Sequence, residues 1–344
     1  MRKLLLKRLG SALLATTLAA QIHPAWQLAE SGSAASFRGI SQAGGTAWVS
    51  GTHGTVLRKT GDGAWRPCAV PPGAEKLDLR GIWAFDDTHA LALSIGPGEQ
   101  SRVYRTSDGC ATWAQVIVNT DPKGFWDGIV FADEKHGLIL GDPVDGRFTI
   151  LTTSDGGEHW TPDADPGLAA LPGEGGFAAS NTSLIVNPDT KTEYLGTGGP
   201  SGPRVLMKAA TAGAGWTAVP VPLSGGSPAA GVFSLAFRDG QHGVAVGGNY
   251  EKPADTAGTA AFTSDAGRNW TAASTPPGGY RSAVGYLAAE RIWVAVGPNG
   301  GDFSADDGKT WTRFDAVNNW NALSPPWAVG PKGKIGKLAI DANR

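Results

Sequence analysis

Three arginines stand at the same place in a short motif that recurs along the chain. The motif reads Phe-Arg-Gly-Ile around Arg38, Leu-Arg-Gly-Ile around Arg80 and Tyr-Arg-Ser-Ala around Arg281. Guanidinium groups bind carboxylates and phosphates through charge-assisted, often paired hydrogen bonds. If the three copies are structurally equivalent, the arginines gather at one site and hold one anion.

An acidic residue takes the same place in a fourth copy, Trp-Asp-Gly-Ile around Asp127, which we expect beside Arg80. Two interpretations therefore stay open: the arginines bind an external anion, or they pair with acidic neighbours such as Asp142, Glu99 and Glu174 and fill the interior. Glycine-containing hairpins supply further candidate binding residues. These are Asp142, Arg147, Arg204, Asn249, Tyr250 and Asn299.

Templates for catalysis are missing from the sequence. The six histidines lack metal-ligand spacing, and neither a Gly-x-Ser-x-Gly elbow nor a phosphate-binding loop occurs. Asp142 and Asp145 have the spacing of a turn and lack the further alternate acids of a calcium loop. We expect no catalytic residue, no metal and no cofactor.

A second repeat indicates which elements position the arginines. Its form is Ser/Thr-x-Asp-x-Gly-x-x-Trp, in which the Asp accepts backbone N–H bonds of a turn and the Gly takes a positive φ. The closing Trp then begins a strand and is buried between sheets. The spacing of these Trp residues, 41 to 56, is typical of propeller blades. They are Trp65, Trp113, Trp160, Trp216, Trp270 and Trp311.

A seventh hairpin at Gly330 has no Trp after it, because the chain ends 14 residues later. Trp26, near the start, can supply the missing outer strand. The sequence therefore predicts an all-β, seven-bladed β-propeller of four-stranded antiparallel blades, closed by the N-terminal strand. In a four-stranded blade of this kind, the start of the innermost strand and the glycine-containing hairpin between the second and third strands lie on the same face of the ring. The expected repeats are 36–71, 77–120, 124–164, 174–223, 230–277, 279–317 and 319–340 plus 24–32.

The first 19 residues have the form of a secretory signal peptide, basic and then apolar with small residues before the cleavage site. We expect a single domain from residue 20 to 344, located in the periplasm or secreted, without an integral membrane segment after processing. Loss of the four basic leader residues leaves the chain acidic, which argues against nucleic acid as a partner. Cys68 and Cys110 form either a disulfide or two buried thiols.

The Asp-containing boxes resemble bacterial neuraminidase repeats. With the Arg-Gly-Ile motifs, Gly-Asp-Pro at 141–143 and Trp-Ala-Val-Gly-Pro-Lys-Gly at 327–333, the chain resembles photosystem II stability/assembly factor-like propellers, and within them the non-photosynthetic bacterial members. The resemblance implies a scaffold that binds a protein or peptide, such as a membrane-protein assembly client. It carries over Arg38 and Arg80 alone as members of an arginine-rich binding surface.

The same boxes occur in sialidases, so a sialidase or another glycoside hydrolase is the alternative function. If the resemblance to sialidases extended to activity, the chain would need an Arg triad, a Tyr nucleophile with a Glu partner, and an Asp acid. The motif around Arg38 lacks the Pro that follows in sialidases. Tyr280 and Tyr286 are available as nucleophiles, but no Glu is placed by the sequence to activate either.

Overall fold

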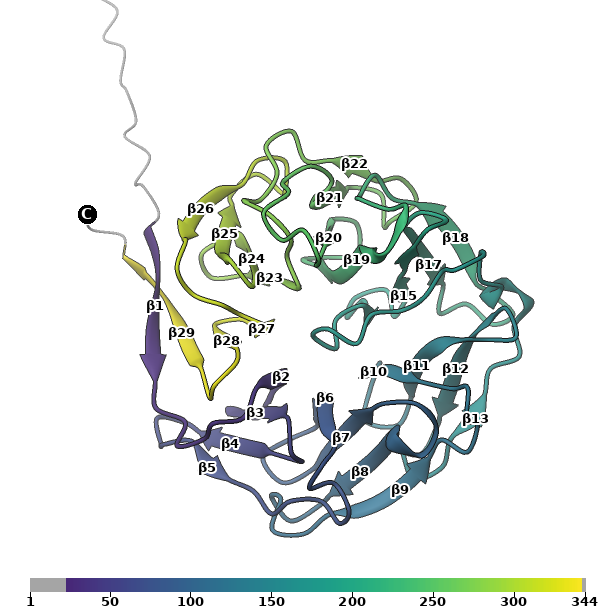
Figure 1. The fold of residues 1–344 in the computed structure, drawn as a ribbon, viewed down its shortest axis with the longest axis vertical. Coiled ribbons are helices and arrows are strands. Elements are labelled where there is room, and N and C mark those ends of the chain that lie inside the picture. The colour runs from purple at the N-terminus through teal and green to yellow at the C-terminus, as the bar shows by residue number, and fades with distance from the viewer. Residues whose placement is uncertain (1–22, 342–344) are drawn as a thin grey trace, which may run out of the picture.

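The computed structural model describes residues 23–341, so the predicted signal peptide lies outside the described residues. Seven antiparallel sheets surround a central opening (Figure 1). The first three blades follow one another along the chain. Blade 1 contains β2 (Phe37–Ala43), β3 (Thr46–Gly51), β4 (Val56–Thr60) and β5 (Arg66–Pro67); blade 2 contains β6 (Asp78–Ala84), β7 (Ala90–Ile95), β8 (Arg102–Thr106) and β9 (Ala114–Val118); blade 3 contains β10 (Trp126–Phe131), β11 (Gly137–Val144), β12 (Arg147–Thr153) and β13 (Thr161–Pro162).

Three further blades repeat this order, and the seventh is shared between the ends of the chain. Blade 4 contains β14 (Leu184–Val186), β15 (Glu193–Gly196), β17 (Arg204–Lys208) and β18 (Thr217–Pro220); blade 5 contains β19 (Ser227–Phe237), β20 (Gly243–Asn249), β21 (Ala260–Thr263) and β22 (Thr271–Ala272), with β16 (Gly198–Gly199) added beside β19; blade 6 contains β23 (Ala283–Leu287), β24 (Ile292–Gly297), β25 (Gly300–Ser304) and β26 (Thr312–Asp315); blade 7 contains β27 (Ala322–Ser324), β28 (Trp327–Val329), β29 (Ile335–Asp341) and β1 (His23–Ala29).

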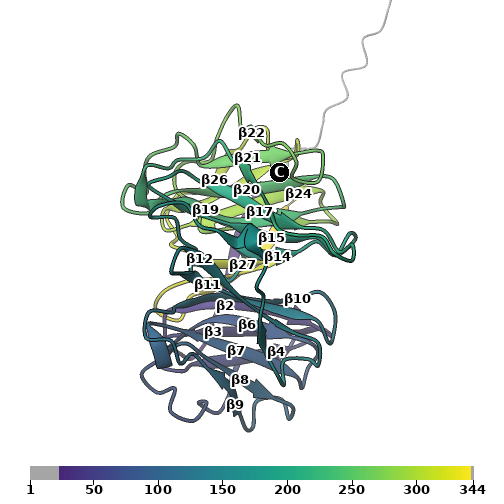
Figure 2. The same cartoon turned by 90° about the vertical axis from the view of Figure 1, so that its right-hand side faces the viewer.

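Helix is nearly absent from this part of the chain. Two short 3-10 helices occur in connections, η1 (Gly98–Gln100) and η2 (Pro166–Leu168). Within residues 23–341, no helix has the length and apolar character needed to cross a membrane. The edge view in Figure 2 shows the strands of blade 2 stacked from β9 at the periphery to β6 near the centre.

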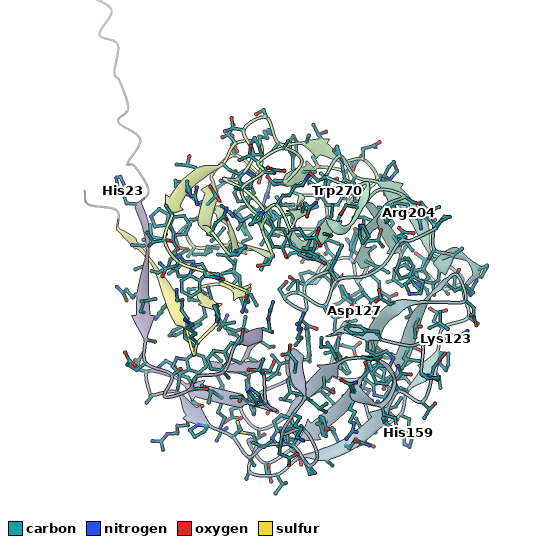
Figure 3. All side chains as sticks on the ribbon, in the orientation of Figure 1. His23, Lys123, Asp127, His159, Arg204 and Trp270 are labelled. Carbon is teal, nitrogen blue, oxygen red and sulfur yellow. A yellow bond between two sulfur atoms is a disulfide. The ribbon has the colours of Figure 1, made fainter. Side chains whose placement is uncertain are left out.

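The ring closes as predicted. β1 pairs antiparallel with β29, and in this register Trp26 lies opposite Leu338. The Trp26 ring packs against Trp320, with ring centroids 4.8 Å apart, and against Phe314 at 5.8 Å. The pairing covers the edge of β29 and completes blade 7 with β1 as its outermost strand, so one sheet holds both ends of the described chain. Figure 1 shows β1 on the outside of blade 7, and Figure 3 marks His23 at its start.

The box turns form as the sequence predicts. In the blade 3 box, Asp155 Oδ1 accepts hydrogen bonds from the backbone N–H groups of Glu158 and His159, both at 3.0 Å. Thr153 Oγ1 accepts the Gly157 N–H at 3.1 Å, and Gly157 has a φ of +85°. These bonds fix the turn that delivers the following Trp to the interface between blades.

One box contains cysteine at the place of this glycine. Cys110 adopts a φ of +67°, a left-handed conformation that side chains with a Cβ rarely take. Its sulfur is bonded to Cys68, which follows β5, so the disulfide joins blade 2 to blade 1. The open choice between a disulfide and two thiols is thus resolved in favour of the disulfide.

Glu193 on β15 carries an unusually buried carboxyl group at the face of the box turns. Its Oε2 is buried and has no hydrogen-bond partner within the described residues. Burial raises the pKa of Glu193 to about 7, although Lys208 acts in the opposite direction. Because the folded state binds this proton more tightly than the unfolded state, ionisation of Glu193 works against folding.

We expect the contribution of Glu193 to the stability of the protein to fall as the pH rises from about 4.5, the ordinary pKa of a Glu side chain, to about 7, the pKa of Glu193 in the fold. Glu193→Gln removes this ionisation. Its melting temperature therefore exceeds that of the wild type at pH 8 and matches it more closely at pH 4. Melting curves from pH 4 to 8 measure this, with exposed Glu290→Gln as the control. Parallel pH profiles for wild type and Glu193→Gln would contradict the assignment.

Candidate functional site

The predicted arginine motif marks an irregular point at the start of the inner strands. In blades 1, 2, 3 and 5 the pairing of the first two strands shifts by one residue there. We call the residue at this shift the rim position. It is Arg38, Arg80, Asp127 and Phe233 in those four blades.

Blade 6 departs from the predicted alignment. A Cβ added to Gly51 would meet the backbone of Phe37, the residue before Arg38, and the equivalent Gly297 approaches Arg281 in the same way. Arg281 therefore takes the place of Phe37, and Ser282 holds the rim position. The prediction that Arg281 is equivalent to Arg38 and Arg80 is wrong by one residue.

This shift places Arg281 in the interior. It is completely buried, and its Nε donates to Asp302 Oδ2 at 2.7 Å. A second nitrogen of Arg281 also bonds Asp302, and another bonds Asn299 Oδ1. Asn299 in turn donates to the Pro253 carbonyl at 2.8 Å. Arg281 and Asn299 thus belong to a buried polar network of blade 6.

Arg38 and Arg80 face a cavity of about 490 Å³ at the central opening, which we call the cup. The two arginines form a cationic wall on blades 1 and 2. Across from them, four aromatic side chains form the second wall, and Phe233 contacts each of the others. These are Phe177, Phe233, Tyr250 and Tyr280. Rim residues Ser282 and Asn321 contribute to the lining from blades 6 and 7, together with Pro298, Asn319 and Trp320.

The floor of the cup is a segment that crosses the central channel. Residues 177–182 belong to the connection between β13 and β14, and Figure 1 shows a loop from this region reaching into the ring. Ser180 Oγ donates to the Ser282 carbonyl of blade 6 at 2.7 Å. Asn181 bonds both backbone groups of Ile129 in blade 3. These contacts to opposite sides of the ring hold the segment across the channel.

The two arginines of the cup differ in how many hydrogen bonds and ion pairs their guanidinium groups make. Arg80 donates through Nε to Asp78 at 2.8 Å and through Nη1 to the Ala178 carbonyl at 2.8 Å. Arg38 makes no hydrogen bond or ion pair within residues 23–341, and its Nε is buried. Burial lowers the pKa of Arg38, and the nearby Arg80 lowers it further. A bound anion would oppose both effects, because it pairs with the desolvated charge.

The acidic candidates Asp127 and Asp142 of blade 3 do not line the cup and lie against Gly175 and Gly176, which precede the crossing segment. Asp127 is 2% exposed, its Oδ2 has no partner within the described residues, and burial raises its pKa well above the usual value. Asp142 Oδ1 accepts the Gly176 N–H at 2.9 Å. A Cβ on Gly176 would lie 2.8 Å from Asp127 Oδ2, so Gly176 covers this carboxyl group. Figure 3 shows Asp127 next to the central opening, with Lys123 and Arg204 farther out.

The hairpin candidates take different roles. Tyr250 lines the cup, and Asp142 lines a neighbouring cavity. Arg204 donates through Nε to Glu174 at 2.8 Å, so this acidic residue pairs with a hairpin arginine and not with Arg38, Arg80 or Arg281. Arg147 bonds the carbonyls of the connection after β13. Asn249 accepts the Glu251 N–H and so caps its own turn.

Sequence reasoning missed several residues of the cup, among them Phe177, Phe233 and Asn321. Phe233 and Asn321 hold rim positions in blades without an Arg-Gly pair, and counting back from the hairpin glycine would have found them. Phe177 lies in the connection of residues 163–183, which contains only the short η2, and connections of this length with so little regular structure are uncommon and often functional.

Large exposed apolar side chains gather on the face that carries the cup. Among the described residues five are exposed, and four lie in loops of this face: Val70, Leu171, Tyr250 and Val317, the last with 88% of its surface accessible. The fifth, Leu28, lies on β1. Two of the four border the cavities of this face: Tyr250 lines the cup, and Leu171 lines the neighbouring cavity.

Solved structures with a similar fold include two YCF48 propellers. The structure of YCF48 bound to D1 peptide has a TM-score of 0.63 at 15% identity, covering 92% of this chain and 97% of that one. YCF48 from Cyanidioschyzon merolae has a TM-score of 0.62 at 17% identity, covering 91% and 98%. The chain has the fold of the YCF48 propellers.

Two further proteins are similar to this chain over part of their own length. The extracellular domain of the putative one component system BT4673 from B. thetaiotaomicron has a TM-score of 0.60 at 13% identity, covering 91% of this chain and 39% of that one. A xyloglucanase from Paenibacillus sp is 28% identical over 277 residues, or 70% of this chain. The match spans 26% of the xyloglucanase's own length. No family model matches the sequence.

Proposed function

We propose that this protein is an exported, non-catalytic propeller scaffold that binds an extended segment of another protein at the cup. Arg38 carries the proposal, since it is a guanidinium without a partner within the described residues, beside a second arginine and opposite an aromatic wall. An acidic residue of the segment pairs with Arg38 and Arg80. Its apolar neighbours pack on Phe233 and Tyr250.

Two further observations support a macromolecular partner. The exposed apolar residues on the same face provide contact area around the cup. One of the structures with the same fold holds a D1 peptide. By analogy, the client is a protein delivered to or assembled at a membrane, and export places the scaffold in the periplasm or outside the cell.

A glycoside hydrolase is the second candidate, favoured by the xyloglucanase match. Glycoside hydrolysis generally needs two carboxyl groups flanking the scissile bond. None of the residues lining the cup is Asp or Glu. Glu174 nearby is engaged by Arg204, and Asp127 is covered by Gly176. Release of reducing sugar from xyloglucan, or turnover of a fluorogenic sialoside, by purified protein would favour this candidate over the scaffold.

We expect Arg38→Met to weaken peptide binding by about 10- to 100-fold, the effect of losing one or two hydrogen bonds to a charged group. Melting temperature stays the same or rises, because the substitution removes an unpaired, half-buried charge. Peptides selected by the protein from a phage-displayed random library provide the probes. Fluorescence anisotropy of the labelled peptides gives the affinities.

The exposed Arg66→Met on β5 is the matched control and should bind like the wild type. Selected peptides that lack acidic residues, or that bind Arg38→Met as tightly as the wild type, would contradict the role of the cup. Failure to select any peptide would contradict peptide binding itself.

A further inference from the structure

A second cavity of about 730 Å³ adjoins the cup on the same face, and we call it the groove. Phe177 lines both cavities, so the groove continues from the cup over this one ring. The groove runs outward between blades 3 and 4, where Phe125, Pro143, Leu171 and Pro172 contribute apolar surface. A ligand seated in the cup can extend into the groove without leaving the protein surface.

Much of the groove wall is bare backbone. Six glycines line it: Gly146 of the β11–β12 hairpin, three from the stretch 173–176 and two from β16. Glycine walls allow another chain to approach closely, and proline and aromatic surfaces suit extended peptides. The wall is held in place by Glu174, which accepts hydrogen bonds from Thr197, Arg204 and the Leu171 N–H. The groove is therefore a built surface suited to an extended main chain.

The charge of the groove is opposite to that of the cup. Lys123 is already paired with Asp145 at 3.0 Å, and Glu174 is paired with Arg204. Asp142 uses Oδ1 for Gly176, and its Oδ2 has no hydrogen-bond partner within the described residues. Burial raises the pKa of Asp142, so a cation in the groove would favour its ionised form. Arg38 in the cup is thus placed to pair with an anion, and Asp142 in the groove is placed to pair with a cation.

We infer that the cup and the groove form one bipartite site for an extended peptide segment in which an acidic and a basic residue are separated by a short apolar spacer. The acidic residue pairs with Arg38, the spacer crosses Phe177, and the basic residue pairs with Asp142. The inference rests on the proposed peptide binding and adds the requirement for a cation.

The test is a double-mutant cycle on the library-selected peptides. Asp142→Asn keeps an oxygen that accepts the Gly176 N–H but removes the charge. We expect Asp142→Asn to weaken peptide binding about 10-fold. Replacing the peptide's basic residue with norleucine should cost a similar factor in the wild type and nothing further in Asp142→Asn. Exposed Asp62→Asn, on the opposite face, should leave binding unchanged. Leu171→Lys, a surface substitution that places a cation in the groove, should also weaken binding.

The outcomes separate the two proposals. Selected peptides without a basic residue, or independent, additive losses in the cycle, would overturn the bipartite site. If those peptides still require Arg38, binding at the cup survives. If Asp142→Asn lowers the melting temperature, its affinity no longer reports on the groove alone, and Leu171→Lys becomes the test. Peptide affinity of Leu171→Lys equal to that of the wild type would then overturn the role of the groove.

Discussion

Arg281→Ala is expected to destabilise the protein by about 3–5 kcal/mol, the cost of breaking one side of a buried ion pair. Asp302 has only 2% of its side chain exposed, so without Arg281 its charge is left in the interior with the Gly278 N–H as its other donor. Asn299 loses its bond to the guanidinium as well. Urea unfolding followed by tryptophan fluorescence measures the change.

Two controls isolate the pair. Arg268→Ala removes an exposed arginine of the same half of the ring and should change stability little. Arg281→Met combined with Asp302→Leu removes both charges and should recover much of the loss, since buried pairs are often replaceable by apolar side chains. A loss below about 1 kcal/mol for Arg281→Ala would match a solvated pair and contradict the buried arrangement.

Cys68→Ser is expected to cost about 4 kcal/mol, because the disulfide closes a loop between cysteines 42 residues apart. Cys110→Gly breaks the same bond but relieves the positive φ at this box position, so it should lose about 1 kcal/mol less. Guanidinium unfolding of both variants and the wild type, with and without reductant, compares them. This account of Cys110 would be contradicted if Cys110→Gly were less stable than Cys68→Ser. It would also be contradicted if reductant left the unfolding free energy of the wild type unchanged.

The fold was predictable because its signals are local and repeated. The box of residues 153–160 contains its own turn bonds, and the spacing of the box Trp residues is set by blade length. The closing strand could also be predicted by counting, because the seventh hairpin, at Gly330, has no box Trp after it and Trp26 belongs to no other repeat. Each of these features depends on nearby residues or on a count.

The site was less predictable because it depends on register and on contacts between blades. Aligning motifs on their arginines placed Arg281 one residue out of register, whereas the backbone aligns on the hairpin glycine. The sequence of residues 177–182, which form the floor of the cup, has no hydrophobic periodicity and no repeat motif. Its position depends on bonds such as Ser180 to Ser282, between residues 102 apart in sequence. Arg38 and Arg80 were found because blades 1 and 2 share a full motif.

Hydrogen–deuterium exchange with a saturating selected peptide tests most directly whether the cup is the binding site. The account predicts slower exchange at the start of β2 and β6, in residues 177–182 that form the floor, and around Tyr250, with the box turns at 153–160 and 263–270 unchanged. Protection confined to the box turns, or absent from the floor segment while the peptide is bound, would contradict it.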